Sequence, residues 1–370
     1  MMKILHISSA LDGGGVDRYI YNYCLRISDN SYDFMVFNEK EGILEKELAN
    51  NGGKIFHLPP MRNGLINYYK SIKKVLESNH YDIIHSHLGY KSVIALYCAK
   101  KRNIKVRIAH AHIAYEPESL LKRVIRKILT HMTMKYATDL FACGKLAGKW
   151  MWGKKKLQNN EIFIHNNAIN IERFSYSADA RLRKKIELGL NNNSKIYGNV
   201  GRLSFQKNQV FLLHVFKKIC DLEPNSILLL VGRGEDENKL IDLAKKLNII
   251  DNVKFLGVRN DVYELLNVMD VFIFPSIYEG FPFTIIEAQC NGLPILLSDT
   301  ITKDCIITQN VFILPINNDE ENYLNWAKTA ITISNFKRNL DGADQIRKAG
   351  FDINIETEKL KEYYIKSFDR

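Results

Sequence analysis

The sequence lacks an apolar run long enough to span a bilayer. A spanning helix needs about 20 consecutive apolar residues, and the apolar stretch at the start is short and breaks into the glycines at 13–15. A start of this form is unlike a signal peptide. We therefore expect a cytoplasmic protein that does not cross the membrane.

Closely spaced cysteines are also lacking. The six cysteines stand singly, and no two have the spacing of a redox or metal-binding motif. We expect them to be free, buried thiols in a reducing compartment. They are Cys24, Cys98, Cys143, Cys220, Cys290 and Cys305.

Acidic residues are scarce in one part of the chain. Residues 1–190 hold 31 Lys/Arg and 17 Asp/Glu, whereas residues 191–370 hold 21 and 24. Residues 100–156 alone hold 15 basic and 3 acidic residues, a net charge of +12. A positive field this concentrated favours a polyanion or an anionic membrane as a partner.

Short apolar strands alternate with amphipathic helices along the chain, which predicts doubly wound parallel sheets. The pattern restarts near residue 195, so 370 residues divide into two domains. We expect strands at 1–9, 32–37, 53–58, 81–87, 106–112, 195–204, 226–232, 253–257, 271–276 and 294–298. The expected helices are 16–28, 68–79, 92–103, 209–224, 238–248, 262–269, 283–292 and 355–368.

The stretch FPSIYEGFPFTIIEAQCNG carries the clearest candidate site. Glu279 lies on the loop after a strand, and Glu287 lies one to two turns into the helix that begins near Phe283. Doubly wound folds bind ligands at such loops, and the free N–H groups of a helix N-terminus suit a phosphate. From spacing alone, Glu279 could equally be a turn acid and Glu287 a solvated helix residue.

Several segments together resemble glycosyltransferase family 4. The Glu279-to-Glu287 stretch resembles its E-x7-E element, and Arg202 and Lys207 match the cations of its G-R-x4-K-N element. DGGGVDR resembles the G-G-x-E-R turn, with Asp17 in place of Glu. VRIAHAH resembles the strand with the active-site histidine, and FIHNNAINIERF the interdomain segment. Within the family, the sequence resembles the EpsF-like enzymes of exopolysaccharide and capsule synthesis.

The resemblance implies a GT-B fold, in which two facing Rossmann-like domains with doubly wound parallel sheets flank a cleft. Residues 1–170 would form the acceptor-binding domain, and residues 171–353 the donor-binding domain. The helix at about 354–370 would pack back on the first domain. Since Ala168 and Asn170 replace Gly and Asp of the interdomain segment, no donor contact is assigned there.

The resemblance also implies the roles of individual residues. Arg202 and Lys207 would neutralise the donor diphosphate, Glu287 would bind the ribose, and Glu279 would hold the donor sugar. His112 would line the donor sugar, which completes a catalytic set with Arg202, Lys207 and Glu279. The donor site would further include Gly14, Gly15, Gly280, Phe281, Phe283 and Thr284. Asp17 is shorter than the usual Glu and is left out.

The implied activity is retaining transfer of a hexose or N-acetylhexosamine from a nucleotide diphosphate sugar, with UDP as the expected nucleotide. The acceptor would be a lipid-linked or growing glycan in capsule, exopolysaccharide or related surface glycan synthesis. No two aspartates are separated by a single residue, so no Asp-x-Asp metal site exists, and we expect no metal and no cofactor. A non-hydrolysing nucleotide-sugar epimerase and a non-catalytic scaffold of the same architecture remain alternatives.

Four histidines lie in two strand candidates, as the pairs His85/His87 and His110/His112. Alternate residues of a strand share a face, so either His110 or His112 could line the donor site, and any of the four could be structural. A zinc site is disfavoured because no third ligand stands at a suitable spacing.

Cations and apolar residues alternate in two basic stretches. Lys122, Arg123, Arg126 and Lys127 stand among Leu121, Val124, Ile125 and Ile128, while Trp150, Met151 and Trp152 precede Lys154, Lys155 and Lys156. This pattern suits an anionic membrane surface, so we expect peripheral association with the inner face of the cytoplasmic membrane through residues 100–156. The alternative is a core-facing apolar stripe with solvated lysines. No nucleic-acid motif is present.

Overall fold

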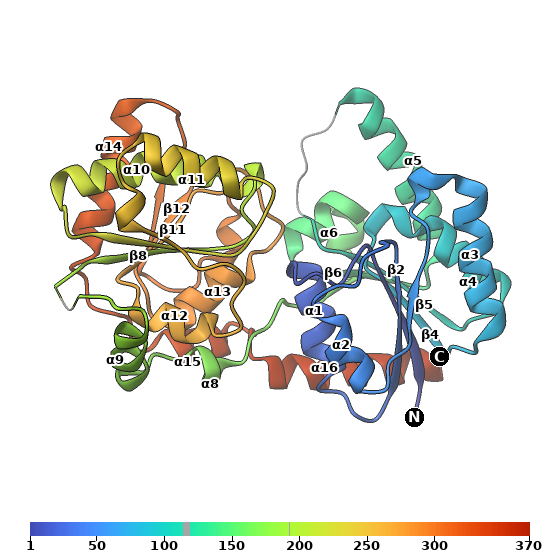
Figure 1. Ribbon diagram of the computed structural model, residues 1–370. Helices are drawn as coiled ribbons and strands as arrows, with labels where there is room; N and C mark the ends of the chain where they lie inside the picture. The colour runs from blue at the N-terminus through green and yellow to red at the C-terminus, as the bar shows by residue number, and fades with distance from the viewer. Residues whose placement is uncertain (114–118, 192) are drawn as a thin grey trace. The chain divides into compact units, whose positions relative to one another are not determined.

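The computed structural model describes residues 1–113, 119–191 and 193–370, which form two compact units (Figure 1). The first unit comprises Met1–Ala168 and Ile353–Arg370, and the second comprises Ile169–Asp352. Helix α16 (Ile353–Asp369) therefore belongs to the first unit, where it lies beside α1 (Gly15–Cys24). The basic region 100–156 includes residues 114–118, which lie outside the described part of the chain.

The first unit is built on a parallel sheet of seven strands in the order β3-β2-β1-β4-β5-β6-β7. The central strands are buried almost throughout, as expected of a parallel sheet with helices on both faces. The strands are β1 (Lys3–Ser8), β2 (Ser31–Val36), β3 (Ile55–His57), β4 (Ile83–Ser86), β5 (Val106–Ala111), β6 (Asp139–Ala142) and β7 (Ile162–Ile164).

Helices connect these strands. They are α1, α2 (Glu45–Asn50), α3 (Leu65–Ser78), α4 (Val93–Lys101), α5 (Leu120–Tyr136), α6 (Lys145–Trp152), α7 (Lys154–Gln158) and the C-terminal α16. From β1 the chain winds outward to β2 and β3, then returns to β4 on the other side. Adjacent β1 and β4 therefore form the switch point of the topology, the place where such sheets bind ligands.

The second unit has a six-stranded parallel sheet in the order β10-β9-β8-β11-β12-β13, with its switch point between β8 and β11. The strands are β8 (Ile196–Val200), β9 (Ile227–Val231), β10 (Val253–Phe255), β11 (Val271–Phe274), β12 (Ile295–Ser298) and β13 (Val311–Leu314). The helices are α8 (Ile171–Phe174), α9 (Ala178–Glu187), α10 (Gln209–Leu222), α11 (Glu237–Lys246), α12 (Val262–Val268), α13 (Phe283–Cys290), α14 (Glu320–Ile333) and α15 (Gly342–Lys348).

The expected doubly wound parallel sheets are confirmed. All ten predicted strands are present within a few residues, whereas β6, β7 and β13 are not among them. Each of these three is only three or four residues long, too short for an alternation of apolar and polar residues to stand out.

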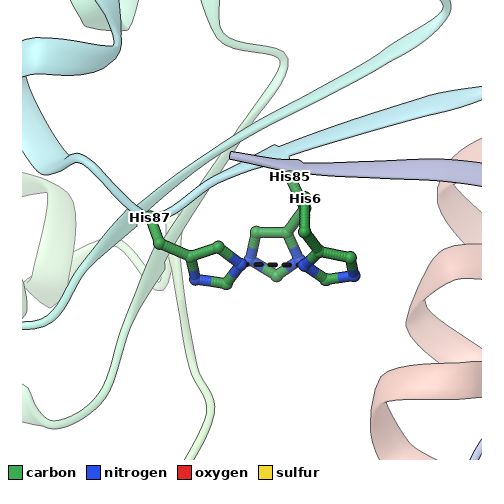
Figure 2. Close-up of side chains that lie close together, drawn as sticks. All are labelled: His6, His85 and His87. Atoms are coloured by element: carbon green, nitrogen blue, oxygen red, sulfur yellow. Dashed lines mark hydrogen bonds between the residues drawn. The ribbon is translucent and has the colours of Figure 1, made fainter. Parts of the chain in front are cut away.

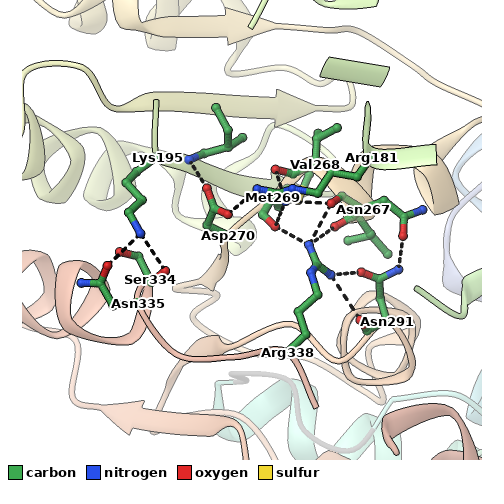
Figure 3. Close-up of polar contacts among 12 residues, drawn as sticks. Arg181, Lys195, Asn267, Val268, Met269, Asp270, Asn291, Ser334, Asn335 and Arg338 are labelled. Carbon is green, nitrogen blue, oxygen red and sulfur yellow. Dashed lines mark hydrogen bonds and ion pairs between the residues drawn. The ribbon is translucent and has the colours of Figure 1, made fainter. Parts of the chain in front are cut away.

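Two arginines fix the end of α12, just before β11 (Figure 3). The Arg338 guanidinium donates to the carbonyls of Leu266 and Asn267 at 3.1 and 2.9 Å. Arg181 donates to the carbonyls of Asn267 and Val268, both at 2.9 Å, and pairs with Asp270 at 2.7 Å. The last carbonyls of a helix lack intrahelical partners, so these cations satisfy them and hold the entry to β11.

Candidate functional site

The loops that follow β8 and β11 leave the sheet at the switch point of the second unit. Lys207, from the first loop, reaches Glu279, from the second, with 2.6 Å between its Nζ and Oε1 of the carboxylate. Both side chains are largely buried. Gln206 strengthens the junction, since its Nε2 donates to the Tyr278 carbonyl at 2.9 Å. The structure thus brings together two residues that are 72 positions apart and that the sequence placed in one site.

Glycines allow the loop after β8 to pack against the loop after β9. A Cβ on Gly232 would lie 2.0 Å from the carbonyl oxygen of Gly201, and one on Gly234 would lie 2.0 Å from that of Leu203. Neither contact is tolerable, so both positions require glycine. Gly232 and Gly234 were not predicted to have a role, although a G-R-G pattern directly after a buried strand could have indicated a tightly packed loop.

Arg202 differs from Lys207 in its surroundings. Its side chain is 72 % exposed and pairs with Glu235, at 2.9 Å between Nε and Oε2. Lys207 is 17 % exposed and lies over the ring of Phe274, with Nζ 4.8 Å from the centroid. The ammonium group of Lys207 is therefore held in one position, whereas the Arg202 guanidinium lies on a solvated side chain.

Helix α13 starts at the other end of the Glu279 loop, as predicted. Its N-cap is Pro282, and no side chain caps the first turn, so N–H groups at this end can meet an anion. The hydroxyl of Thr284 is buried and has no hydrogen-bond partner among the described residues. Glu287 is partly buried on the same helix. A cation, an uncapped helix end and two carboxylates are the groups that would bind a phosphate together with hydroxyls.

In the first unit, Asp17 shapes the glycine turn after β1. Its Oδ2 accepts hydrogen bonds from the backbone N–H groups of Asp12 and Gly14, both at 3.0 Å. Gly13 has φ +88°, a conformation that glycine adopts without strain. Burial raises the pKa of Asp17 to about 6. Asp17 thus has a structural role, since its carboxylate holds the turn that contains Gly14.

Six imidazoles gather in the first unit beneath Tyr19 of α1. They come from three adjacent strands and from the end of β7, and their rings pack against one another; for example, the centroids of His110 and His112 are 3.9 Å apart. The set comprises His6, His85, His87, His110, His112 and His165. Four of them had been singled out in the sequence, whereas His6 and His165 had not, because they stand singly.

Burial keeps these rings neutral. It lowers the pKa of His6 and His112 to about 3 and that of His165 to about 4. For His85, His87 and His110, burial and then the neighbouring histidines hold the pKa well below the ordinary value. His110 is fully buried, and His112, at the carboxyl end of β5, is partly exposed.

The expectation that no third metal ligand stands near the histidine pairs is wrong. Candidate nitrogens of His6, His85 and His87 lie within 4.8 Å of one another (Figure 2). Those of His87, His110 and His112 do so as well. However, His6 and His87 are joined edge to edge by a hydrogen bond, at 2.9 Å between Nδ1 and Nε2, so the nitrogens that face each other are already engaged. His85 lies parallel to His87, with 4.3 Å between the ring centroids and 19° between the planes. His85 also bonds Tyr364 and His110 through its two nitrogens, at 2.7 and 3.0 Å. This arrangement is a hydrogen-bonded stack that does not fit a tetrahedral metal site.

Comparison with known families identifies both units. Residues 13–173 match the model described as "Glycosyltransferase Family 4", and residues 181–334 match "Glycosyl transferases group 1". Together these ranges span most of both units. They agree with the resemblance drawn from the motifs.

Individual relatives of this chain are also named as glycosyltransferases. A protein of Bacillus subtilis (strain 168) named as glycosyltransferase EpsF is 26% identical over 307 residues, which cover 81% of this chain and 80% of its own. The Escherichia coli UDP-Gal:alpha-D-GlcNAc-diphosphoundecaprenol alpha-1,3-galactosyltransferase is 26% identical over 98% of this chain and 97% of its own. The crystal structure of Anabaena Alr3699/HepE in complex with UDP-glucose matches with a TM-score of 0.81 at 19% identity, covering 99% of this chain and 100% of its own. This last likeness shows a shared fold, GT-B.

The neutral histidines predict a marked acid sensitivity of the first unit. Their folded-state pKa values lie below the unfolded value of about 6.5, so below that pH the unfolded chain binds more protons and stability falls. Each such group contributes a slope of about 1.4 kcal/mol per pH unit. Asp17, with its raised pKa, opposes this between about pH 6 and 4, but as a single group. We expect the first unit to unfold between about pH 6 and 5.

Tryptophan fluorescence can follow this transition in one unit at a time. In a Trp326→Phe variant, the remaining tryptophans, Trp150 and Trp152, both belong to the first unit. Fluorescence that is unchanged down to pH 4 would contradict a neutral histidine stack.

Proposed function

Because the chain belongs to the glycosyltransferases that join a family 4 domain to a group 1 domain, we propose that it transfers a hexose or N-acetylhexosamine from a UDP-sugar. The proposed acceptor is a lipid-linked or growing glycan in capsule, exopolysaccharide or related surface glycan synthesis. The name of the Escherichia coli relative, with its UDP-Gal donor and diphosphoundecaprenol acceptor, supports both halves of this proposal. The second unit would bind the donor, and the first the acceptor.

The ion pair between Lys207 and Glu279 carries the proposal. It joins the two loops at the switch point, next to the uncapped end of α13. A lysine ammonium has three N–H donors, so Lys207 can hold Glu279 and still meet a diphosphate oxygen. The negative charge that builds up on the leaving diphosphate would then face a cation placed in advance, together with the N–H groups of α13.

The remaining donor contacts follow from the same geometry. Arg202, on its exposed side chain, would close on the diphosphate from solvent. Glu287 would accept hydrogen bonds from the ribose, and Gly280, Phe281, Phe283 and Thr284 would surround the sugar and phosphate. In the first unit, Gly14, Gly15 and His112 are proposed as sugar-binding residues at that unit's own ligand edge.

We further propose a retaining, metal-independent transfer. The carboxylate of Glu279 is engaged by Lys207 at 2.6 Å and by Gln206 at 3.4 Å. It is therefore placed to hold sugar hydroxyls and is not assigned as a nucleophile. Lys207, Arg202 and the end of α13 supply the positive charge that a divalent cation would otherwise supply.

Replacing Lys207 with Ala should lower turnover about 10²–10³-fold, the usual effect of removing one preplaced electrostatic group. The measurement is UDP release, with nucleotide sugars screened as donors. Lys239→Ala is the matched control, since Lys239 is exposed in the same unit. Thermal unfolding of both variants checks that Glu279, left without its partner, has not unfolded the unit. Turnover within twofold of the parent protein would reject the role of Lys207.

Metal independence has a separate test. The same assay in excess EDTA should give an unchanged rate, because the cations are side chains. A rate that EDTA abolishes and that Mn²⁺ or Mg²⁺ restores would show that the diphosphate is neutralised by a metal instead.

The first three turns of α5 carry the proposed membrane contact. Five apolar side chains on one arc of this helix are exposed, by 46 to 77 %: Leu120, Leu121, Val124, Ile125 and Ile128. The alternative that these positions face the core is therefore wrong. The cations of α5, which are Lys122, Arg123, Arg126 and Lys127, occupy the rest of the helix. An exposed apolar arc beside a basic one suits an anionic lipid surface.

The structure corrects two residues of this expectation. Met151 and Trp152 are only 4 % and 3 % exposed, and Trp152 donates its indole N–H to the carbonyl of Phe141 at 2.8 Å, so both belong to the core and cannot enter a membrane. Trp150 lies against Arg126, with the guanidinium 4.4 Å from the ring centroid. No helix in the described ranges is long and apolar enough to cross a bilayer. We therefore propose peripheral binding to the inner face of the cytoplasmic membrane through α5.

The protein should sediment with vesicles rich in anionic lipid at low salt and less at about 0.5 M salt, because salt screens the cations. Leu121→Glu with Ile125→Glu should reduce binding at least tenfold even at low salt, since both side chains leave the apolar arc. Ile186→Glu is the matched control, an exposed apolar residue of the second unit. Equal binding by parent and double variant would remove α5 from the membrane contact.

A further inference from the structure

Three of the six histidines form a continuous hydrogen-bonded chain across adjacent strands. Nδ1 of His6 lies 2.9 Å from Nε2 of His87, and Nδ1 of His87 lies 2.9 Å from Nε2 of His112. The two outer nitrogens, Nε2 of His6 and Nδ1 of His112, are buried without a hydrogen-bond partner among the described residues. The chain therefore has an open end on β1 and another at the carboxyl end of β5.

This connectivity ties the three tautomers together. A neutral imidazole has one N–H donor and one acceptor nitrogen, and each hydrogen bond needs one of each. If His6 donates from Nδ1, His87 and His112 must also carry their protons on Nδ1. If His112 donates from Nε2, all three must carry them on Nε2. The chain has only these two neutral states, and in both of them His6, His87 and His112 share one tautomer.

The surroundings favour neutral rings. Among the described residues, the titratable groups that face His87 and His112 are His85 and His110 beside them in the sheet, Tyr19 from α1 and His165 after β7. All of these are uncharged at neutral pH, so none of them supplies a counter-charge to an imidazolium. To pass from the Nδ1–H state to the Nε2–H state, the chain must take up a proton at Nε2 of His6 and release one from Nδ1 of His112.

We propose that His87 and His6 are positioning residues that set the tautomer of His112, whose Nδ1 hydrogen-bonds a hydroxyl of the sugar substrate. A buried nitrogen without a hydrogen-bond partner destabilises the folded state, so this atom favours a ligand. A hydroxyl can both donate and accept, and thus fits either state of the chain. A phosphate or carboxylate only accepts, and would force all three histidines to the Nδ1–H tautomer. The identity of the ligand rests on the proposed function, whereas the coupling of the tautomers does not.

The coupling is tested by ¹⁵N NMR of the full-length protein with labelled histidine, without any substrate. The ¹⁵N shifts distinguish Nδ1–H, Nε2–H and cationic rings, and single His→Gln variants assign the signals. At pH 7 we expect His6, His87 and His112 to be neutral and to share one tautomer. A cationic ring, or two different tautomers among the three, would overturn the proposal.

A matched pair of variants separates positioning from packing. His87→Phe keeps a ring in the stack but removes both hydrogen bonds of the chain. His85→Phe makes the same change in the neighbouring chain that runs through Tyr364 and His110. We expect His87→Phe to give His112 a mixture of tautomers and to lower kcat/KM about tenfold, within the range seen when a partner that orients a histidine is removed.

His85→Phe should leave the tautomer of His112 unchanged. If it disturbs His112 as much as His87→Phe does, the role of His87 is packing and the proposal fails. Should a variant not fold, the NMR result on the parent protein still decides the coupling. Coupled tautomers in a protein that turns over no nucleotide sugar would uphold the chain and reject the proposed function instead.

Discussion

The ion pair between Lys207 and Glu279 is the contact on which the proposed donor site depends. It exists because β8 and β11 are neighbours in a parallel sheet, so that the loops leaving their carboxyl ends meet at one edge. Residues outside both loops fix their positions. Gly232 and Gly234 let the first pack tightly, and Arg181 and Arg338 fix the helix end before β11. The buried ammonium of Lys207 and the N–H groups of α13 therefore both lie next to the loop that carries Glu279.

The first unit differs from the second, because the ligand edge of its sheet lies next to a polar core that carries no net charge. Six imidazoles lie where a parallel sheet ordinarily buries aliphatic side chains. They remain neutral through burial, and hydrogen bonds to one another and to neighbouring residues engage most, but not all, of their nitrogens. Asp17 adds a carboxylate near this edge, bound to backbone N–H groups of the glycine turn. Hydroxyl-rich ligands suit a surface of neutral donors and acceptors better than charged ones do.

The order of motifs predicted the fold, the two loops that carry Lys207 and Glu279, and the start of α13, because these depend on local patterns. Other features depend on tertiary contacts. His6 stands alone in the sequence, and only the pairing of β1 with β4 brings it to His87. Trp152 was predicted to be part of a basic, aromatic surface, but on α6 its side chain is buried in the core. The apolar residues of α5 had the spacing of a core helix, and their exposure could not be read from that spacing.

A donor site on the second unit is tested most directly by hydrogen–deuterium exchange with and without UDP, since exchange locates the nucleotide on the chain. We expect UDP to slow exchange in residues 201–208 and 276–290, and Lys207→Ala to weaken this protection. UDP binding that protects neither segment, or no UDP binding at all, would contradict a donor site at the switch point of the second unit.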